Sequence, residues 1–223
     1  MMIQLLLLGF AWADQRIDPG LEALVARIDE VNSQITTLKA DFTQRKEISL
    51  LTEPMEKTGA FFLDKPNAMK FEFDPESELV LLINQEEMVS ISHKDKRAER
   101  IEMPKRKSDL TKMLITEQLH NLLKVFSIGR VDQTKTTGDQ QLVLYPERRK
   151  LKKKIDEIRI WVNEDYLIYR IKVTSPDGDT FELHLANIVV NPELDANLFD
   201  TAIPEDYEIG DRLEFILGPN SGF

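Results

Sequence analysis

The fold is decided by residues 59–75, which read GAFFLDKPNAMKFEFDP. Two apolar runs flank the turn-forming residues 64–67, which include a proline that cannot donate a hydrogen bond to a sheet. In the second run every other residue is apolar, namely Met69, Phe71 and Phe73. Alternation with a period of two is typical of a half-buried strand, so the stretch predicts an antiparallel hairpin with one apolar face. On this pattern alone, that face could simply pack against an ordinary core.

The composition is that of a globular protein. The chain has 223 residues, of which 42% are hydrophobic and 30% charged, enough for one large β-rich domain or two small domains. Lysine and arginine number 29 against 39 acidic residues, and the net charge of −10 argues against binding to nucleic acid. Because the chain contains no cysteine, disulfides, thiol nucleophiles, cysteine metal sites and lipidation on a cysteine are excluded.

The first residues resemble a secretory signal. A short apolar run, residues 3–10, precedes Ala11-Trp12-Ala13, which has the small-x-small pattern of a cleavage site. The run is shorter than the roughly 20 apolar residues that span a bilayer. We therefore expect a signal peptide over residues 1–13 and an exported, soluble protein. No lysine or arginine precedes the run, and a buried first element is the alternative.

The rest of the chain alternates between two periods. Apolar residues recur at helical spacing over residues 20–35 and again over 109–126, where Ser108 can cap the second helix. All other regular segments read as strands joined by short turns, which predicts one large antiparallel sheet curled into a barrel or half-barrel. The strand signals cover residues 38–44, 59–63, 69–73, 79–84, 88–93, 97–103, 131–136, 140–145, 155–163, 167–174 and 180–190.

Catalytic constellations are not evident in the sequence. The three histidines, His93, His120 and His184, lack the spacing of metal ligands, and no glycine-rich phosphate loop or Gly-x-Ser-x-Gly motif occurs. We therefore do not expect an enzyme, and we expect no metal and no cofactor.

Two basic clusters interrupt the acidic background. Six charges within seven residues must repel one another, so the second cluster is expected to be exposed. Each cluster is either a solvated loop or a docking surface for an acidic partner or anionic lipid. The first comprises Lys105, Arg106 and Lys107, and the second comprises Arg148, Arg149, Lys150, Lys152, Lys153 and Lys154.

Several short motifs carry a family resemblance through their order and spacing. They are Leu38-x-Ala40-x-Phe42-Thr43-Gln44, the segment from Gly59 to Asn67, Met69-x-Phe71-x-Phe73, Pro75-Glu76, and Asn197-Leu198-Phe199 followed by Pro204. From about Leu21 to about Ile209 the chain resembles the LolA family, the periplasmic carriers of outer-membrane lipoproteins. The resemblance implies a mainly β (α+β) fold, an open antiparallel half-barrel of about eleven strands with an N-terminal helix and a helical lid insertion.

In that family the concave apolar face holds acyl chains and the helices cover it. The resemblance places the lipid-binding cavity at Leu24, Ile28, Val31, Phe42, Met69, Phe71 and Phe73. It places the lid at Leu110, Met113, Leu114, Leu119, Leu122, Leu123 and Phe126. We expect the concave face to be hollow beneath a mobile cover. An arginine at the turn before the Pro-Asn pair latches the lid in the family, and here Lys65 stands in that place. Lysine lacks the planar fork of arginine and cannot direct several hydrogen bonds at once.

The resemblance also implies partners and a compartment. The expected cargo is an acylated lipoprotein, received from an inner-membrane ABC-type transporter and passed to an outer-membrane receptor by a monomer in the periplasm. Residues 14–210 would form the carrier domain and residues 211–223 a flexible tail. The lack of cysteine argues against the lipidated receptor itself. Two alternatives remain on the same fold: a periplasmic lipid-binding sensor, or a carrier of a glycolipid or phospholipid.

Overall fold

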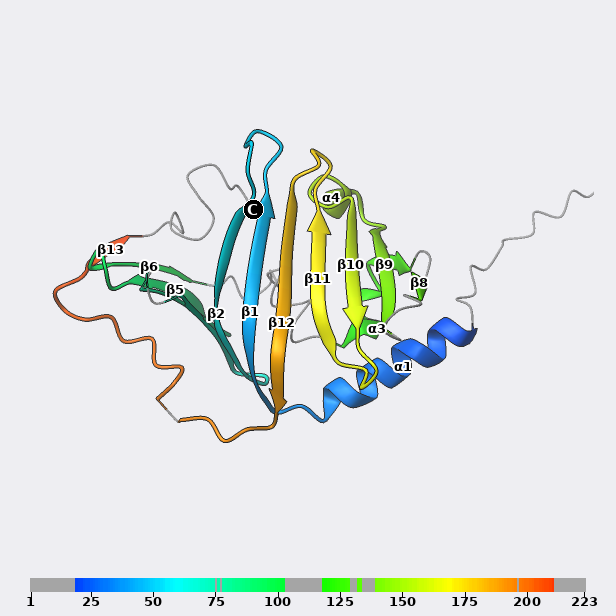
Figure 1. Cartoon of the computed structure of the whole chain (residues 1–223), viewed down its shortest axis with the longest axis horizontal. Coiled ribbons are helices and arrows are strands. Elements are labelled where there is room, and N and C mark those ends of the chain that lie inside the picture. The colour runs from blue at the N-terminus through cyan, green and yellow to red at the C-terminus, as the bar shows by residue number, and fades with distance from the viewer. Residues whose placement is uncertain are drawn as a thin grey trace, which may run out of the picture.

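One curved sheet organises the molecule. The computed structural model describes residues 19–74, 76, 78–102, 118–128, 132–133, 139–195 and 197–210. Within this part, thirteen strands join in the order β13-β6-β5-β4-β3-β2-β1-β12-β11-β10-β9-β7, with β8 also paired to β9 (Figure 1). The strands are β1 (Thr37–Glu47), β2 (Met55–Asp64), β3 (Ala68–Phe73), β4 (Leu79–Asn84), β5 (Glu87–Ser92), β6 (Arg97–Glu102), β7 (Phe126–Ile128), β8 (Asp132–Gln133), β9 (Gln140–Pro146), β10 (Glu157–Val162), β11 (Ile168–Thr174), β12 (Thr180–Val190) and β13 (Glu208–Gly210).

The predicted open antiparallel half-barrel is confirmed. The long central strands β1 and β12 pair with each other, and the order ends at β13 on one side and β7 on the other without closing. The short strands β8 and β13 extend the sheet beyond the eleven or so expected. One of them, β13, pairs with β6 in the parallel direction.

The opening hairpin forms as the alternation predicts. Strand β3 alternates between half-buried and buried side chains, and it pairs with β2 across the turn at 65–67. Gly59 lies where the strands approach most closely, because a Cβ there would collide with the backbone oxygen of Glu72. Glycine is therefore required at this position for packing rather than for conformation.

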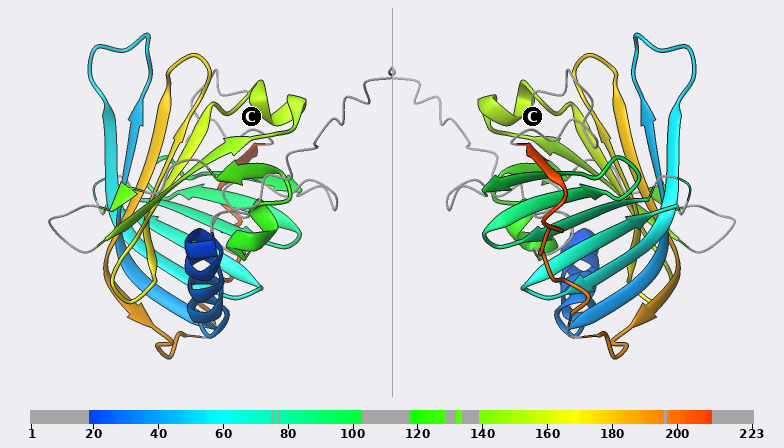
Figure 2. Two further views of the ribbon diagram at one scale, coloured as in Figure 1. Left: turned by 90° about the vertical axis from the view of Figure 1, so that its right-hand side faces the viewer. Right: turned by 90° about the vertical axis from the view of Figure 1, so that its left-hand side faces the viewer.

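The helices lie inside the curve of the sheet. Figure 2 shows α1 (Pro19–Ser33) on this concave side, with α3 (Leu119–Leu122) beside it. Helix α1 buries Val25 and Ile28 against the half of the sheet that contains β9, β10 and β11. A third helix, α4 (Arg149–Lys152), follows β9 at the surface. None of the helices in the described ranges is long and apolar enough to cross a membrane.

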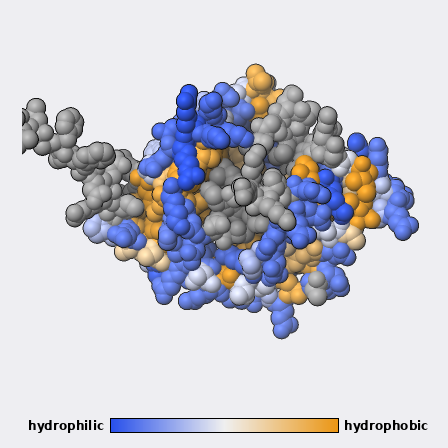
Figure 3. All heavy atoms as spheres, turned by 180° about the vertical axis from the view of Figure 1, so that it is seen from behind, coloured by the Kyte–Doolittle hydropathy of each residue, from blue (hydrophilic) through white to orange (hydrophobic). Residues whose placement is uncertain are grey.

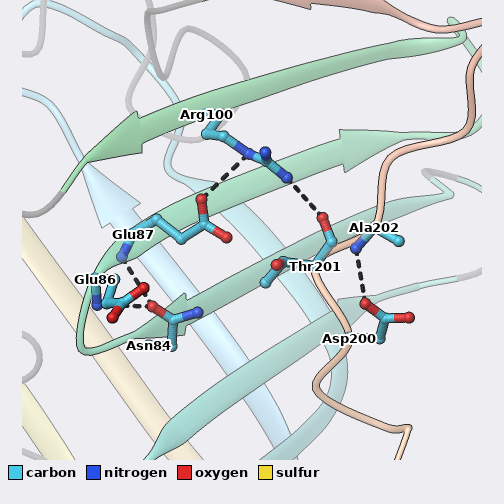
Figure 4. Close-up of polar contacts among 7 residues, drawn as sticks. All are labelled: Asn84, Glu86, Glu87, Arg100, Asp200, Thr201 and Ala202. Atoms are coloured by element: carbon cyan, nitrogen blue, oxygen red, sulfur yellow. Dashed lines mark hydrogen bonds and ion pairs between the residues drawn. The ribbon is translucent and has the colours of Figure 1, made fainter.

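The C-terminal segment covers the opposite, convex face. Phe199, Ile203 and Tyr207 pack against apolar residues of β4, β5 and β6 that point away from the concavity. Polar contacts fix the segment (Figure 4): Arg100 donates to the backbone oxygen of Thr201 at 2.8 Å and pairs with Glu87 at 3.2 Å. The apolar residues on this part of the convex face are therefore covered by the chain itself.

The predicted lid helix is partly corrected. The helix was expected to continue to Phe126, but α3 ends at Leu122 and Phe126 begins strand β7. Residues 126–128 pair with the edge of β9 and satisfy its backbone hydrogen-bonding groups. The chain is therefore a strand at Phe126, where the sequence predicted a helix. Several expectations fall outside the described residues: the signal peptide (1–13), the lid residues Leu110, Met113 and Leu114, the cluster Lys105, Arg106 and Lys107, and the tail (211–223).

Candidate functional site

An aromatic wall lines one half of the concave face. The predicted residues Phe42, Met69, Phe71 and Phe73 are all buried and belong to one cluster built from β1 to β5 and β12. The ring of Phe42 meets the rings of Phe71 and Phe73 edge-on, at centroid distances of 5.3 and 5.2 Å. Phe61, which the sequence analysis did not single out, lies 4.8 Å from Phe71 and is fully buried. The wall is thus a set of interlocking rings without polar atoms.

The helical residues form a second cluster on the other half. Ile28 is buried and Leu24 packs against the same cluster, while Val31 is half-buried. The described lid residues join them, with Leu119, Leu122 and Phe126 buried and Leu123 at the margin. The predicted cavity residues therefore divide between the aromatic wall and this helix-covered cluster.

Helix α3 is tied to α1 by a single carboxylate. Asp29 accepts hydrogen bonds from the backbone N–H groups of Leu119 at 2.6 Å and His120 at 3.1 Å. The N-cap residue of α3, Gln118, provides no side-chain cap of its own. Asp29 therefore acts as the N-cap of α3 from another element, satisfying donors that a helix start leaves open.

Lys65 reaches the end of α1. Its Nζ donates to the backbone oxygen of Asn32 at 2.9 Å, and burial lowers the pKa of the ammonium. Asn32 in turn donates to the backbone oxygen of Tyr166 at 3.4 Å, from the turn between β10 and β11. Lys65 thus contacts a single carbonyl of the covering helix, at the C-terminal end where a positive charge is favourable.

The space between wall and helix is small. Seen from the concave side, the described surface shows hydrophobic patches set between hydrophilic side chains (Figure 3). A cavity of about 50 Å³ lies beside Lys65, among Ile35, Leu38, Leu63 and Leu185. Pockets that hold small ligands commonly measure roughly 300–1,000 Å³. The cavity beside Lys65 is smaller than such pockets, and a hollow concave face beneath a mobile cover stays a prediction.

The second basic cluster lies at the surface. Arg148, Arg149 and Lys150 are exposed, as are Lys152, Lys153 and Lys154, and four of the seven residues 148–154 form helix α4. The sequence analysis predicted an exposed loop or docking surface here and did not predict a helix. No group of three or more histidine or acidic side chains in the described ranges is arranged to hold a metal ion.

Comparison with known families matches this architecture. The model of the family described as "Outer membrane lipoprotein carrier protein LolA" matches residues 33–202. The chain belongs to the LolA family. The match runs from the end of α1 to the C-terminal segment and so includes the aromatic wall, Lys65 and the cover residues 118–128. No curated protein sequence matches the chain.

The chain is similar to several solved structures at low sequence identity, and the first two below share its fold. An uncharacterized conserved protein from Thermus thermophilus is 11% identical, with a TM-score of 0.53, and the match covers 86% of this chain and 99% of that one. A DUF1329 family protein from Desulfovibrio piger is 10% identical, with a TM-score of 0.50 and coverage of 83% and 98%. A LolA superfamily protein from Nitrosomonas europaea is 11% identical, with a TM-score of 0.42 and coverage of 80% and 97%.

Proposed function

We propose that this protein is a periplasmic carrier of acylated lipoproteins, which binds their acyl chains against the aromatic wall. One observation carries the proposal: a wall of phenylalanine and methionine side chains lies on the concave face, beside a cluster covered by helices that a few polar contacts hold in place. A carrier must both bind apolar chains and release them. An apolar face next to helices that can detach meets both requirements.

The energetics of chain burial favour such a carrier. Each methylene group that moves from water into apolar surroundings contributes about 0.8 kcal/mol. A pair of long acyl chains therefore provides ample affinity without any directed contact. Against this gain stands the cost of separating the helices α1 and α3 from the sheet. Met69 is unbranched and polarizable, which allows this part of the wall to adapt to chains of differing shape.

The family and the first residues support a proposal for the compartment and the partners. The predicted signal peptide would direct the chain to the periplasm. We propose that an inner-membrane ABC-type transporter supplies the cargo and that an outer-membrane receptor accepts it. The exposed residues 148–154 offer a positively charged surface for docking to an acidic partner or to anionic lipid.

The first experiment identifies what the protein binds. Protein purified from the periplasm is examined by native mass spectrometry, and we expect acyl chains attached to a lipoprotein. In cells depleted of the protein, lipoproteins should accumulate in the inner membrane, as measured by fractionation. Normal lipoprotein sorting in depleted cells, together with a bound phospholipid or glycolipid, would instead favour a carrier of another lipid.

A further inference from the structure

The loop between β1 and β2 is apolar and projects from one end of the sheet. Figures 1 and 2 show that this loop, residues 48–54, extends beyond the neighbouring turn between β11 and β12. Leu50 is 93% exposed, Leu51 50% and Met55 43%. Single exposed apolar side chains are common in folded proteins. Here three of the seven large hydrophobic side chains that are exposed in the described ranges lie within six residues, so they form one apolar surface.

Contacts within the fold hold this loop in place. The backbone N–H of Leu51 donates to the carbonyl oxygen of Ile48 at 2.8 Å, which makes a turn. The backbone N–H and the hydroxyl of Ser49 both donate to one carboxylate oxygen of Asp179 at 2.8 Å, and these bonds lower the pKa of that carboxyl group. The exposed leucines are therefore presented to solvent by a loop with defined contacts to the neighbouring turn.

The second basic cluster lies at the same end of the sheet. Its residues 148–154 connect β9 to β10, and Figures 1 and 2 show α4 at the end from which the loop projects. The register leads from the start of β10 to the end of β1 through four successive partners, namely Glu157, Thr174, Thr180 and Glu47. At about 4.8 Å between neighbouring strands, the ends of β10 and β1 are about 14 Å apart. One extended surface can therefore contact the loop and the cluster together.

The loop and the cluster differ in chemical character. Residues 147–156 contain the six exposed basic side chains of the cluster and two acidic ones, Glu147 and Asp156, which leaves a net charge of +4 in a chain whose total is −10. The loop contains Glu53 and no basic residue, and the turn between β11 and β12 contains two acidic residues. Positive charge is thus concentrated at the cluster, while the loop contributes apolar area.

We propose that this end of the sheet docks on an anionic lipid bilayer, with Leu50 and Leu51 entering the lipid and the second basic cluster facing the head groups. Apolar side chains that enter the boundary between head groups and acyl chains, together with basic residues near anionic lipid, bind proteins to membrane surfaces. A bilayer offers negative charge and an apolar interior at every point of its surface. An acidic protein would instead need an acidic patch and an apolar pocket about 14 Å apart. The proposal adds the loop to the docking surface and commits that surface to lipid, whatever cargo the protein carries.

Vesicles of two compositions test the contribution of charge. Protein purified from the periplasm is mixed with vesicles of phosphatidylcholine, either alone or with about one third phosphatidylglycerol, and binding is measured by flotation. We expect tighter binding to the anionic vesicles. Lys152→Gln/Lys153→Gln/Lys154→Gln should bind them roughly 100-fold more weakly, since each basic residue near such a surface strengthens binding about fivefold. Lys152→Arg/Lys153→Arg/Lys154→Arg keeps the charge and should bind like the unchanged protein.

Substitution of exposed apolar residues tests the loop. Leu50→Ser/Leu51→Ser should weaken binding to the anionic vesicles by at least about tenfold, because two leucine side chains no longer move from water into lipid. Val189→Ser is the matched control: Val189 is 51% exposed, much as Leu51 is, but lies at the opposite end of β12 from the loop. Its binding should equal that of the unchanged protein.

A fluorescent label reports which part of the protein meets the bilayer. Because the chain contains no cysteine, Leu50→Cys and Val189→Cys each provide a single site for the environment-sensitive dye NBD. Addition of the anionic vesicles should shift the emission of the dye to shorter wavelength at position 50 and leave it unchanged at position 189.

The outcomes separate the docking surface from the carrier function. The proposed surface would be overturned by absence of binding to the anionic vesicles, by equal binding to both compositions, by full binding of Leu50→Ser/Leu51→Ser, or by an equal shift of the dye at both positions. Docking of the basic cluster to an acidic protein would then remain. These vesicles contain no lipoprotein, so the carrier function is tested separately, by the lipids that native mass spectrometry detects. Thermal unfolding of each variant verifies that it is folded.

Discussion

Lys65 holds the covering helix through one hydrogen bond, and that bond can be removed without disturbing the packing of the side chain. Methionine preserves most of the apolar stem but cannot donate to the carbonyl of Asn32. We expect Lys65→Met to lower the free energy of unfolding by about 1 kcal/mol, because the lost bond is offset in part by the relief of a buried charge. Hydrogen exchange in α1 should become faster.

A second variant separates the bond from the general effect of substitution at a turn. Lys65→Arg restores a donor that can reach the same carbonyl, and the exchange rate in α1 should return toward that of the unchanged protein. If α1 exchanges equally in all three proteins, Lys65 does not hold the helix and is only a turn residue.

Lys46 of β1 and Lys57 of β2, both half-buried, predict a dependence of stability on pH. Burial lowers the pKa of Lys46 and Lys57 below the ordinary value of 10.5, so the unfolded chain binds more protons in the window just below 10.5. The free energy of unfolding contributed by these groups must therefore rise with pH across that window. Compared with the unchanged protein, Lys46→Gln/Lys57→Gln should be more stable at pH 7, and the difference should narrow toward pH 10.5.

Urea unfolding of both proteins over this pH range measures the effect. All other titrating groups are common to the two proteins. Their contributions therefore cancel in the difference between the two free energies of unfolding. A double variant that is less stable than the unchanged protein at neutral pH would contradict this prediction, because it would show that the two lysines stabilise the fold.

Among the elements, α3 depends most on a partner. It has four residues and takes its N-terminal cap from Asp29 of α1. A helix this short does not hold together by itself, and an N-cap contributes about 1 kcal/mol. Asp29→Ala should therefore accelerate hydrogen exchange at Leu119 and His120 and expose residues 118–125 to proteolysis.

The neighbouring residue Glu30 offers a control for this prediction. Its side chain is exposed and pairs with Arg27 on the same helix, an interaction of little energetic value. Glu30→Ala should leave exchange in α3 unchanged. Equal protection of α3 in Asp29→Ala would show that the packing of Leu119 and Leu122 alone holds this helix.

The limits of the strands could be predicted from sequence more closely than those of the helix expected over residues 109–126. The predicted limits 79–84 agree with those of β4, because alternation and turn residues are local signals. Strands β7 and β13 have only three residues each and exist because β9 and β6 present open edges to them. Such pairings are not encoded in local periodicity, so the helical spacing of 109–126 extended the predicted helix too far.

Part of the candidate site could also be predicted, because the alternation of residues along a strand is a local signal. Met69, Phe71 and Phe73 alternate with polar residues, so their shared face could be read from one strand. Phe61 is followed by another phenylalanine, and only the register of β2 against β1 decides which ring points inward.

At the scale of the whole molecule, the proposed function requires the helices α1 and α3 to move before a chain can bind. The cavity of about 50 Å³ beside Lys65 is too small for an acyl chain, and the wall is already buried. Binding that requires a slow opening step shows an observed rate that reaches a plateau as ligand concentration rises. Stopped-flow fluorescence with a dansyl-labelled fatty acid measures this rate.

The plateau value of the observed binding rate depends on the contacts that hold helices α1 and α3 in place. Asp29→Ala removes about 1 kcal/mol from the closed state, so its plateau should be about fivefold higher than that of the unchanged protein. Glu30→Ala, which leaves the contact between α1 and α3 in place, should give the original plateau. A rate that increases linearly with ligand concentration, and equally in all three proteins, would mean that the wall is accessible without movement of the helices. In that case acyl chains would have to bind elsewhere than beneath α1 and α3.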